Sequence, residues 1–274
     1  MPKLSVALIT WNEETRIADC LKSVEFADEI VVVDSFSTDR TKELAEQSGA
    51  RCYLRPFDNF SAQKNFAIEQ TTGDWILLID ADERVSPALQ SEIAQTIHQA
   101  EALEGYYLRR ENYIFSGRMR YSASLQDRQL RLIKKNKGRF EGLIHERVRV
   151  DGAVGTLTHP LLHYSSQTLE DYFKRFNLYT SLEARQIFKR GIKPNAWHFF
   201  LKPAFQFFYF YIFRLGFLDG LRGLQYQLLS SFYTFVKYAK ADELFRKPSS
   251  FSATPLPDAL EEAGIASAEN PSER

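Results

Sequence analysis

Short apolar runs alternate with helical segments along the first hundred residues. Strands are predicted at 4–10, 29–34, 50–54 and 75–80, and helices at 13–23, 38–47 and 59–70. The runs 30–33 and 75–79 are continuously apolar, which is typical of strands in a sheet covered on both faces. A further helix is expected to begin at Ser86-Pro87, where a capping hydroxyl precedes a proline. This alternation predicts an α/β fold with a mainly parallel sheet and right-handed crossovers.

The pattern changes after about residue 105. Short β-like pieces are expected at 106–110, 129–133 and 147–150, and helices at 168–189, 196–218 and 221–240. Glycine and charged residues separate the β-like pieces, which indicates a mixed extension of the sheet rather than further parallel units. After Lys247 the chain is rich in serine, proline and alanine, a composition typical of a disordered tail.

Composition narrows the classes of function. The 274 residues, 44% of them hydrophobic, suffice for one large domain or for a domain with an appendage. Since 35 basic residues balance 35 acidic ones, the net charge gives no reason to expect a nucleic-acid partner. Cys20 and Cys52 lack ligand-like spacing and are expected to be reduced thiols of a cytosolic protein. The first apolar run is too short for a secretion signal and has no cleavage site after it.

Polar side chains follow three of the expected strands. Thr10-Trp11-Asn12-Glu13 follows the first strand, Asp34-Ser35-Phe36-Ser37 the second, and Asp80-Ala81-Asp82-Glu83 the fourth. One such group often only caps the next helix. Open α/β sheets, however, bind ligands outside the carboxyl ends of their strands. Three groups on one edge therefore predict a binding site there.

Asp80 and Asp82 carry the most specific signal. Two carboxylates two residues apart repel one another unless a cation lies between or beside them. Hard oxygen ligands of this kind suit Mg²⁺ or Mn²⁺, which usually share their coordination with substrate phosphates. The pair therefore predicts a divalent-cation and diphosphate site.

Four segments resemble motifs of glycosyltransferase family 2 in their order and spacing. They are Ser5-Val-Ala-Leu-Ile-Thr-Trp-Asn-Glu13, Val32-Val-Asp-Ser-Phe-Ser-Thr-Asp39, Gln63-Lys-Asn65 and Leu78-Ile-Asp-Ala-Asp-Glu83. The later Arg131-Leu-Ile-Lys134 and Glu141-Gly-Leu-Ile-His-Glu146 resemble its bacterial envelope-polysaccharide branch. Within that branch, Lys202-Pro203 and Gly216-Phe-Leu-Asp-Gly220 are similar to lipopolysaccharide core glycosyltransferases that add glucose or heptose. The resemblance covers residues 3–243, and its motifs are specific for the family but not for the sugar.

The resemblance implies a GT-A fold, in which a nucleotide-binding α/β half is joined to an acceptor-binding half. Thr10, Asn12 and Glu13 would line the nucleoside pocket. Asp34 would hold the base or ribose, and Lys64 would approach the base or the diphosphate unless it is simply a solvated helix lysine.

The resemblance also implies roles for the two aspartates, Asp80 and Asp82. Asp80 would contact the ribose or the metal, and Asp82 would bind the metal through one carboxylate. One departure is Phe36, which stands where the family commonly has glycine.

The general base has three candidates. An inverting transferase needs a carboxylate to take the proton of the acceptor hydroxyl. Glu146 beside His145 resembles the family's His-Glu pair, so Glu146 is the first candidate and His145 a further metal ligand or phosphate donor. A surface ion pair of Glu146 with a neighbouring arginine is the alternative. Asp127 is the second candidate for the base and Glu141 the third.

The segment 196–239 contains 16 of the chain's 38 aromatic residues. Its apolar stretch is interrupted by Gln206 and Arg214 and is shorter than the roughly 20 residues of a spanning helix. Aromatic residues with flanking basic charge predict a segment lying in the membrane interface, with Phe207, Phe210 and Phe213 in contact with lipid. A buried helix pair or an oligomer contact is the alternative.

Together these patterns predict an inverting, divalent-metal-dependent glycosyltransferase at the inner face of the cytoplasmic membrane. It would transfer glucose or heptose from a nucleotide-diphosphate donor to a lipid-linked envelope glycan, with a lipopolysaccharide inner core favoured. The expected regions are a nucleotide-sugar half at 1–104, an acceptor half at 105–167, a membrane-associating helical region at 168–243 and a tail at 244–274. The alternatives are a nucleotidyltransferase of similar fold, which would carry a glycine-rich phosphate loop after the first strand, and a catalytically silent membrane scaffold.

Overall fold

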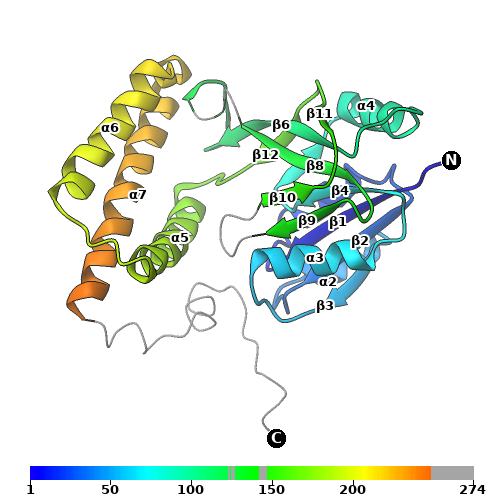
Figure 1. The fold of residues 1–274 in the computed structure, drawn as a ribbon, viewed down its shortest axis with the longest axis horizontal. Helices are drawn as coiled ribbons and strands as arrows, with labels where there is room; N and C mark the ends of the chain where they lie inside the picture. The colour runs from blue at the N-terminus through cyan, green and yellow to red at the C-terminus, as the bar shows by residue number, and fades with distance from the viewer. Residues whose placement is uncertain (123, 125–126, 142–146, 248–274) are drawn as a thin grey trace, which may run out of the picture. The chain divides into compact units, whose positions relative to one another are not determined.

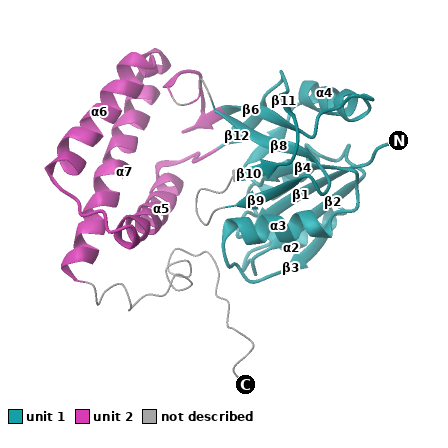
Figure 2. Ribbon diagram, viewed as in Figure 1, with its two compact units in different colours: residues 1–111, 127–164, 265–274 teal, residues 112–126, 165–264 magenta. Residues whose placement is uncertain are grey.

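The computed structural model describes residues 1–122, 124, 127–141 and 147–247. These residues form two compact units (Figure 2). One, which we call the sheet unit, contains Met1–Glu111 and the described part of Asp127–Tyr164. The other, which we call the helical unit, contains the described parts of 112–126 and 165–247.

Four parallel strands form the centre of the sheet unit. They are β1 (Leu4–Thr10), β2 (Glu29–Asp34), β3 (Arg51–Leu54) and β4 (Trp75–Asp80), in the order β3-β2-β1-β4. Both faces of β2 and β4 are largely buried, as their continuous apolar runs predicted, and β1 between them is buried as well, whereas β3 at the edge is partly exposed. On β1, Val6 and Leu8 join one apolar cluster while Ala7 joins the other.

Helices cover both faces of this sheet. They are α1 (Ile17–Lys22), α2 (Thr41–Gln47), α3 (Phe60–Gln70) and α4 (Pro87–Ile97). α1 and α4 pack into the first apolar cluster, and α3 into the second (Figure 1). α3 and α4 begin where predicted, because Asn59 and Ser86 accept hydrogen bonds from backbone N–H groups of the first turn.

α1 and α2 begin later than predicted. Asn12 has a φ of 49°, and a turn closed by the bond from Arg16 N to Glu13 O precedes α1. Before α2, the carboxylate of Asp39 accepts hydrogen bonds from both the N–H and the hydroxyl of Thr41. In both places polar side chains fold the residues after a strand into a loop, which α-helical periodicity alone does not reveal.

A mixed extension continues the sheet beyond β4, as predicted for the region after residue 105. The order continues β8 (Arg128–Lys134), β6 (Gly105–Ile114), β12 (Leu161–Tyr164) and β5 (Glu83–Val85), with β7 (Gly117–Met119) and β11 (Val154–Thr156) paired to β6. β8 runs antiparallel to both β4 and β6, as β7 does to β6 and β12 to β5, whereas β11 runs parallel to β6. β9 (Gly138–Glu141) and β10 (Arg147–Val150) form a separate antiparallel pair. Pairing of β5 with β12 joins residues that are about 80 positions apart in sequence.

The helical unit contains α5 (Leu169–Lys189) and α7 (Gly220–Arg246). Between them, the helix expected at 196–218 consists of π-helix η2 (Trp197–Leu201), α6 (Lys202–Phe208), π-helix η3 (Tyr209–Phe213) and the 3₁₀ turn η4 (Gly216–Asp219). α7 continues to Arg246, past the expected start of the tail at 244, and 248–274 lie outside the described residues. No helix in the described part of the chain combines the length and the apolar composition needed to cross a bilayer.

Candidate functional site

The carboxyl ends of β1, β2 and β4 meet at one edge of the sheet. Thr10 is the register partner of Asp34, and Ile9 is the partner of Asp80. The three polar groups predicted to share this edge are therefore adjacent in space. Thr10 is buried, and its Oγ1 has no hydrogen-bond partner among the described residues. A buried hydroxyl in that state fits a site whose remaining partner is a ligand.

Asp34 is the floor of the loop that follows β2. It is 1% exposed, and the N–H and hydroxyl of Ser37 donate to its two oxygens at 2.8 and 2.5 Å. Ser37 Oγ accepts from the N–H of Asn12, and Asn12 Oδ1 accepts from the N–H of Thr38, both at 2.8 Å. Burial raises the pKa of Asp34, while the bonds from Ser37 oppose that shift. The loops after β1 and β2 are thus one hydrogen-bonded unit.

Phe36 occupies a left-handed backbone conformation with a φ of 61°. Such a conformation costs an ordinary residue about 1–2 kcal/mol and glycine almost nothing. This explains why the position suits glycine in the motif that the segment resembles. The phenylalanine ring is exposed rather than packed in the core, so the loop keeps its shape through Asp34 and Ser37.

Two further predicted donor-site residues lie differently. The carboxylate of Glu13 pairs with Arg16 at 3.2 Å, and the N–H of Glu13 donates to Thr41. Lys64 comes from α3 and is 8% exposed, with its Nζ 3.1 Å from Asp80 Oδ1. Lys64 is therefore a buried, ion-paired residue and not a solvated helix lysine.

Asp80 is held between two cations. Its Oδ2 lies 2.5 Å from the guanidinium of Arg131 on β8, opposite the contact with Lys64. Burial alone would raise the pKa of Asp80, but the charges of Arg131 and Lys64 outweigh that effect and hold it well below its usual range. Asp80 is consequently a permanent anion whose two oxygens are both engaged.

Arg131 and Arg110 connect this aspartate to a buried network. Arg131 also donates to Glu83 Oε1 at 2.8 Å, and Glu83 is completely buried. Arg110 of β6 lies 3.6 Å from the same oxygen and binds both oxygens of Asp127 at 3.0 Å. No role was predicted for Arg131, Arg110 or Glu83 from the sequence. Only Arg131 carried a signal, as a charged residue between Leu130 and Leu132, since Arg110 and Glu83 have charged neighbours in their strands.

Arg131→Gln should lower the free energy of unfolding by about 3–5 kcal/mol, the usual effect of removing one partner of a buried ion pair. The loss leaves Asp80 and Glu83 close together without their shared cation. Urea unfolding followed by circular dichroism measures it. Arg128→Gln, at an exposed position on the same strand, is the control and should change stability by less than about 0.5 kcal/mol. Equal stability of the two variants would contradict this account of the network.

Asp82 lies beside His163. Pairing of β5 with β12 brings His163 opposite Glu83, and His163 Nε2 is 3.6 Å from Asp82 Oδ2. Both side chains are largely buried, and the carbonyl of Asp82 accepts from the N–H of Tyr164 at 2.7 Å. His163 was not singled out in the sequence, because nothing local distinguishes it from other strand residues.

Mn²⁺ can take both a carboxylate oxygen and an imidazole nitrogen, whereas Mg²⁺ prefers oxygen, so this pair fits one divalent cation and suits Mn²⁺ better than Mg²⁺. Asp80 differs, since its oxygens already bind Arg131 and Lys64. Within the described ranges, no three His, Cys, Asp or Glu side chains converge on a single ion position.

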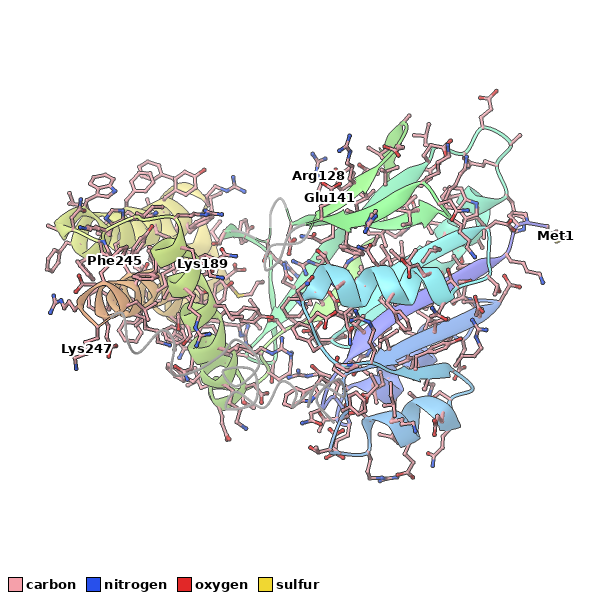
Figure 3. All side chains as sticks on the ribbon, turned by 60° about the horizontal axis from the view of Figure 1, so that its bottom comes forward. Met1, Arg128, Glu141, Lys189, Phe245 and Lys247 are labelled. Carbon is pink, nitrogen blue, oxygen red and sulfur yellow. The ribbon has the colours of Figure 1, made fainter. Side chains whose placement is uncertain are left out.

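Two of the three candidate bases, Asp127 and Glu141, lie within the described residues. Asp127 is clamped by Arg110, as given above, and Glu141 at the end of β9 is an exposed residue 3.9 Å from Arg149. Figure 3 labels Glu141 on its strand. Glu146 and His145 lie outside the described residues.

Comparison with known proteins relates this chain to glycosyltransferases. The family model described as glycosyl transferase family 2 matches residues 5–155. LpsC of Rhizobium meliloti, a lipopolysaccharide core biosynthesis glycosyltransferase, is 32% identical over 88% of this chain and 93% of its own length. An uncharacterized glycosyltransferase of Rickettsia bellii is 31% identical over 88% of this chain and 87% of its own.

Two solved structures are also similar. Staphylococcus aureus TarS 1–349 matches with a TM-score of 0.46 and 16% identity, over 90% of this chain and 92% of that one. Glucosyl-3-phosphoglycerate synthase of Mycobacterium tuberculosis, crystallised with Mn²⁺, UDP and glucosyl-3-phosphoglycerate, matches with a TM-score of 0.34 and 25% identity, over 40% of this chain and 44% of that one. The family model spans more than half of the chain and LpsC is related along nearly all of it, so the chain belongs to glycosyl transferase family 2 and is a glycosyltransferase.

Proposed function

We propose that this enzyme is an inverting transferase that moves a sugar from a nucleotide-diphosphate donor to a lipid-linked envelope glycan. The acceptor we favour is a lipopolysaccharide inner core and the sugar glucose or heptose, because the relative LpsC is named for core biosynthesis. The observation that carries the proposal is the pair Asp82 and His163 beside the strand ends that bear Asp34 and Asp80. A nucleotide-diphosphate donor needs a divalent cation that neutralises its phosphates, carboxylates that hold this cation, and buried polar groups that bind the nucleoside.

The nucleoside would bind over the joined loops after β1 and β2. Asp34 would accept hydrogen bonds from the base or ribose, and the Thr10 hydroxyl would gain the partner it otherwise lacks. Asn12 and Glu13 would form the wall of this pocket. Lys64 and Asp80 would stand between nucleoside and diphosphate, with Arg131 keeping Asp80 ionised and in place.

Asp82 and His163 would hold a divalent cation, with His145 as a further candidate ligand. Bound there, the cation would act as a Lewis acid that stabilises the departing diphosphate. The protein's own part is to hold Asp82 in the turn before β5 and His163 on the neighbouring β12, and to keep Arg131 and Lys64 close to the anionic edge.

Glu146 would take the proton of the acceptor hydroxyl as that oxygen attacks the anomeric carbon from the side opposite the diphosphate. Asp127 is the alternative base. Its two bonds to Arg110 favour a structural part for it, since both oxygens are already acceptors.

We assign the regions as follows: 1–104 to the donor, 105–167 to the acceptor and 168–243 to membrane association. A lipid-linked acceptor requires the enzyme to work at a membrane surface, and we place it peripherally at the inner face of the cytoplasmic membrane. Anionic lipid there would attract the exposed cations Lys189, Arg190 and Lys193.

A thermal-shift screen of nucleotide sugars with and without Mn²⁺ tests the proposal. A donor present at about 100 times its dissociation constant should add about 2.7 kcal/mol to stability, and raise the melting temperature by several degrees. The rise should require Mn²⁺ and should be larger for UDP- or ADP-sugars than for a nucleoside alone. Stabilisation by nucleoside triphosphates with release of pyrophosphate would instead favour a nucleotidyltransferase.

A further inference from the structure

The segment 197–213 presents an apolar face to solvent. Two adjacent rows of residues spaced four apart form it: Trp197, Leu201, Phe205, Tyr209 and Phe213 in one, and Phe200, Ala204, Phe208 and Ile212 in the other. All are exposed, Phe200, Phe205 and Phe213 to 70%, 66% and 75%. We call this surface the aromatic face. Phe207 and Phe210, which the sequence placed beside Phe213 against lipid, are instead half-buried.

The two π-helical turns explain how the face stays continuous. In an α-helix, residues four apart are displaced by about 40° around the axis, so a row of five would wind about 160° round it. A π-helix bonds residue i to i+5 and has more residues per turn, so it turns such a row the other way. η2 and η3 lie at the two ends of α6 and offset its displacement. Both rows therefore stay on one side.

The opposite side of the same segment packs on α7 through both polar and aromatic side chains. Lys202 Nζ is 2.5 Å from the hydroxyl of Tyr238. Gln206 bonds to Ser230 Oγ at 2.8 Å and accepts from Thr234 Oγ1 at 2.5 Å. Phe199 also packs on Phe235, with 5.8 Å between the ring centroids, so hydrogen bonds and ring contacts together join these helices.

α7 repeats the arrangement. It buries Gln227 and Thr234, and Gln227 donates to Ser122 Oγ at 2.7 Å. It exposes Leu221 and Leu228, the first to 70%. The exposed rings of the segment stand away from its axis in the side-chain view (Figure 3).

A helix in water turns its apolar stripe to the core and its polar residues outward. Here the outward rows contain only apolar or aromatic residues, while polar side chains bond between the helices, as in proteins whose surroundings are hydrocarbon. Soluble chains normally expose apolar residues singly, whereas the aromatic face joins its residues into one continuous surface.

From this distribution of apolar and polar side chains we infer that the aromatic face and the exposed leucines of α7 are immersed among lipid acyl chains, with the helices lying along the bilayer surface. Lys189, Arg190 and Lys193, all exposed, precede Trp197 and meet the anionic headgroups. A second copy of the chain is a poorer occupant, because a twofold contact brings identical surfaces, with the same flanking cations, together. The inference deepens the proposal of a lipid-linked acceptor, yet its test uses no turnover.

Flotation of the full-length protein with vesicles measures the attachment. The wild type should float with phosphatidylglycerol–phosphatidylcholine vesicles and remain bound in about 0.5 M NaCl, because salt screens charges but not apolar burial. Phe200→Ser/Phe205→Ser/Phe213→Ser should bind at least about tenfold more weakly at low salt. Leu103→Ser/Val154→Ser, which alters two exposed apolar residues of the sheet unit, should float as the wild type does.

Trp197, which is 55% exposed, supplies a second measurement on an unaltered chain. Its fluorescence should shift to the blue with vesicles and be quenched by lipids brominated on the acyl chains, and Trp197→Phe removes the signal. Complete release of the wild type by salt would overturn the inference, as would unquenched Trp197. Failure to float combined with a dimer that the triple variant dissociates would assign the face to a second copy. None of these outcomes depends on whether the donor or the metal is correctly identified.

Discussion

Asp82→Asn should lower turnover by at least about 10²-fold and abolish the stabilisation that Mn²⁺ and donor give together. The amide is neutral and a poorer ligand for a hard cation, while its size is almost unchanged. Developing charge on the diphosphate then loses its Lewis acid. Product formation under saturating donor gives the rate, and titration calorimetry of Mn²⁺ with the donor gives the affinity. Asp19→Asn, at an exposed position of α1, is the matched control and should behave as wild type.

Non-additivity makes this test specific for the pair. If Asp82 and His163 hold one ion, His163→Ala alone should cause a similar loss, and the double variant should be little worse than either single one. His159→Ala is the control for His163→Ala, because it removes an imidazole that pairs with Glu92 instead of Asp82. Effects that multiply, or a wild type fully active in excess chelator, would show that the two residues do not share a metal.

The parallel half of the fold could be predicted from the sequence because its causes are local. β1, β2 and β4 have the boundaries that their apolar runs predicted, and Asn59 and Ser86 cap α3 and α4. Each of these features is read within one turn or one strand. The polar residues at the strand ends then share an edge because parallel strands all end there.

The rest of the site depends on pairings between distant strands. His163 reaches Asp82 only because β12 pairs with β5, and Arg131 reaches Asp80 only because β8 lies next to β4. No periodicity in either segment encodes its partner. Arg131 stands between two leucines in the sequence, but nothing there identifies the carboxylates that it binds.

The helical unit shows a different limit. Aromatic composition predicted a lipid-facing segment, with Phe207, Phe210 and Phe213 on the outer side of one helix over 196–218. Phe213 is 75% exposed, but Phe207 and Phe210 are half-buried, and the segment contains two π-helical turns that a regular α-helix lacks. Spacing in fours, rather than in threes and fours, was the available signal.

Glu146→Gln should lower turnover by about 10²–10⁴-fold, the usual effect of removing a general base, while the donor's affinity stays unchanged. Glutamine keeps the shape of the side chain but cannot take a proton from the acceptor hydroxyl. Loss of the base should also remove the fall in turnover at low pH, because that limb reports its protonation. Single-turnover rates across pH, with donor affinity measured separately, give both readouts.

Asp127→Asn distinguishes the two candidates. Both oxygens of Asp127 bind Arg110, and Arg110 lies 3.6 Å from buried Glu83. Neutralising Asp127 should therefore lower the melting temperature clearly but reduce turnover only slightly. The low-pH limb of the rate profile should stay in place. Glu141→Gln, at the exposed end of β9, should change neither. A dead Asp127 variant without its low-pH limb, beside an active Glu146 variant, would exchange the two roles and make the Arg110 clamp a device for orienting the base.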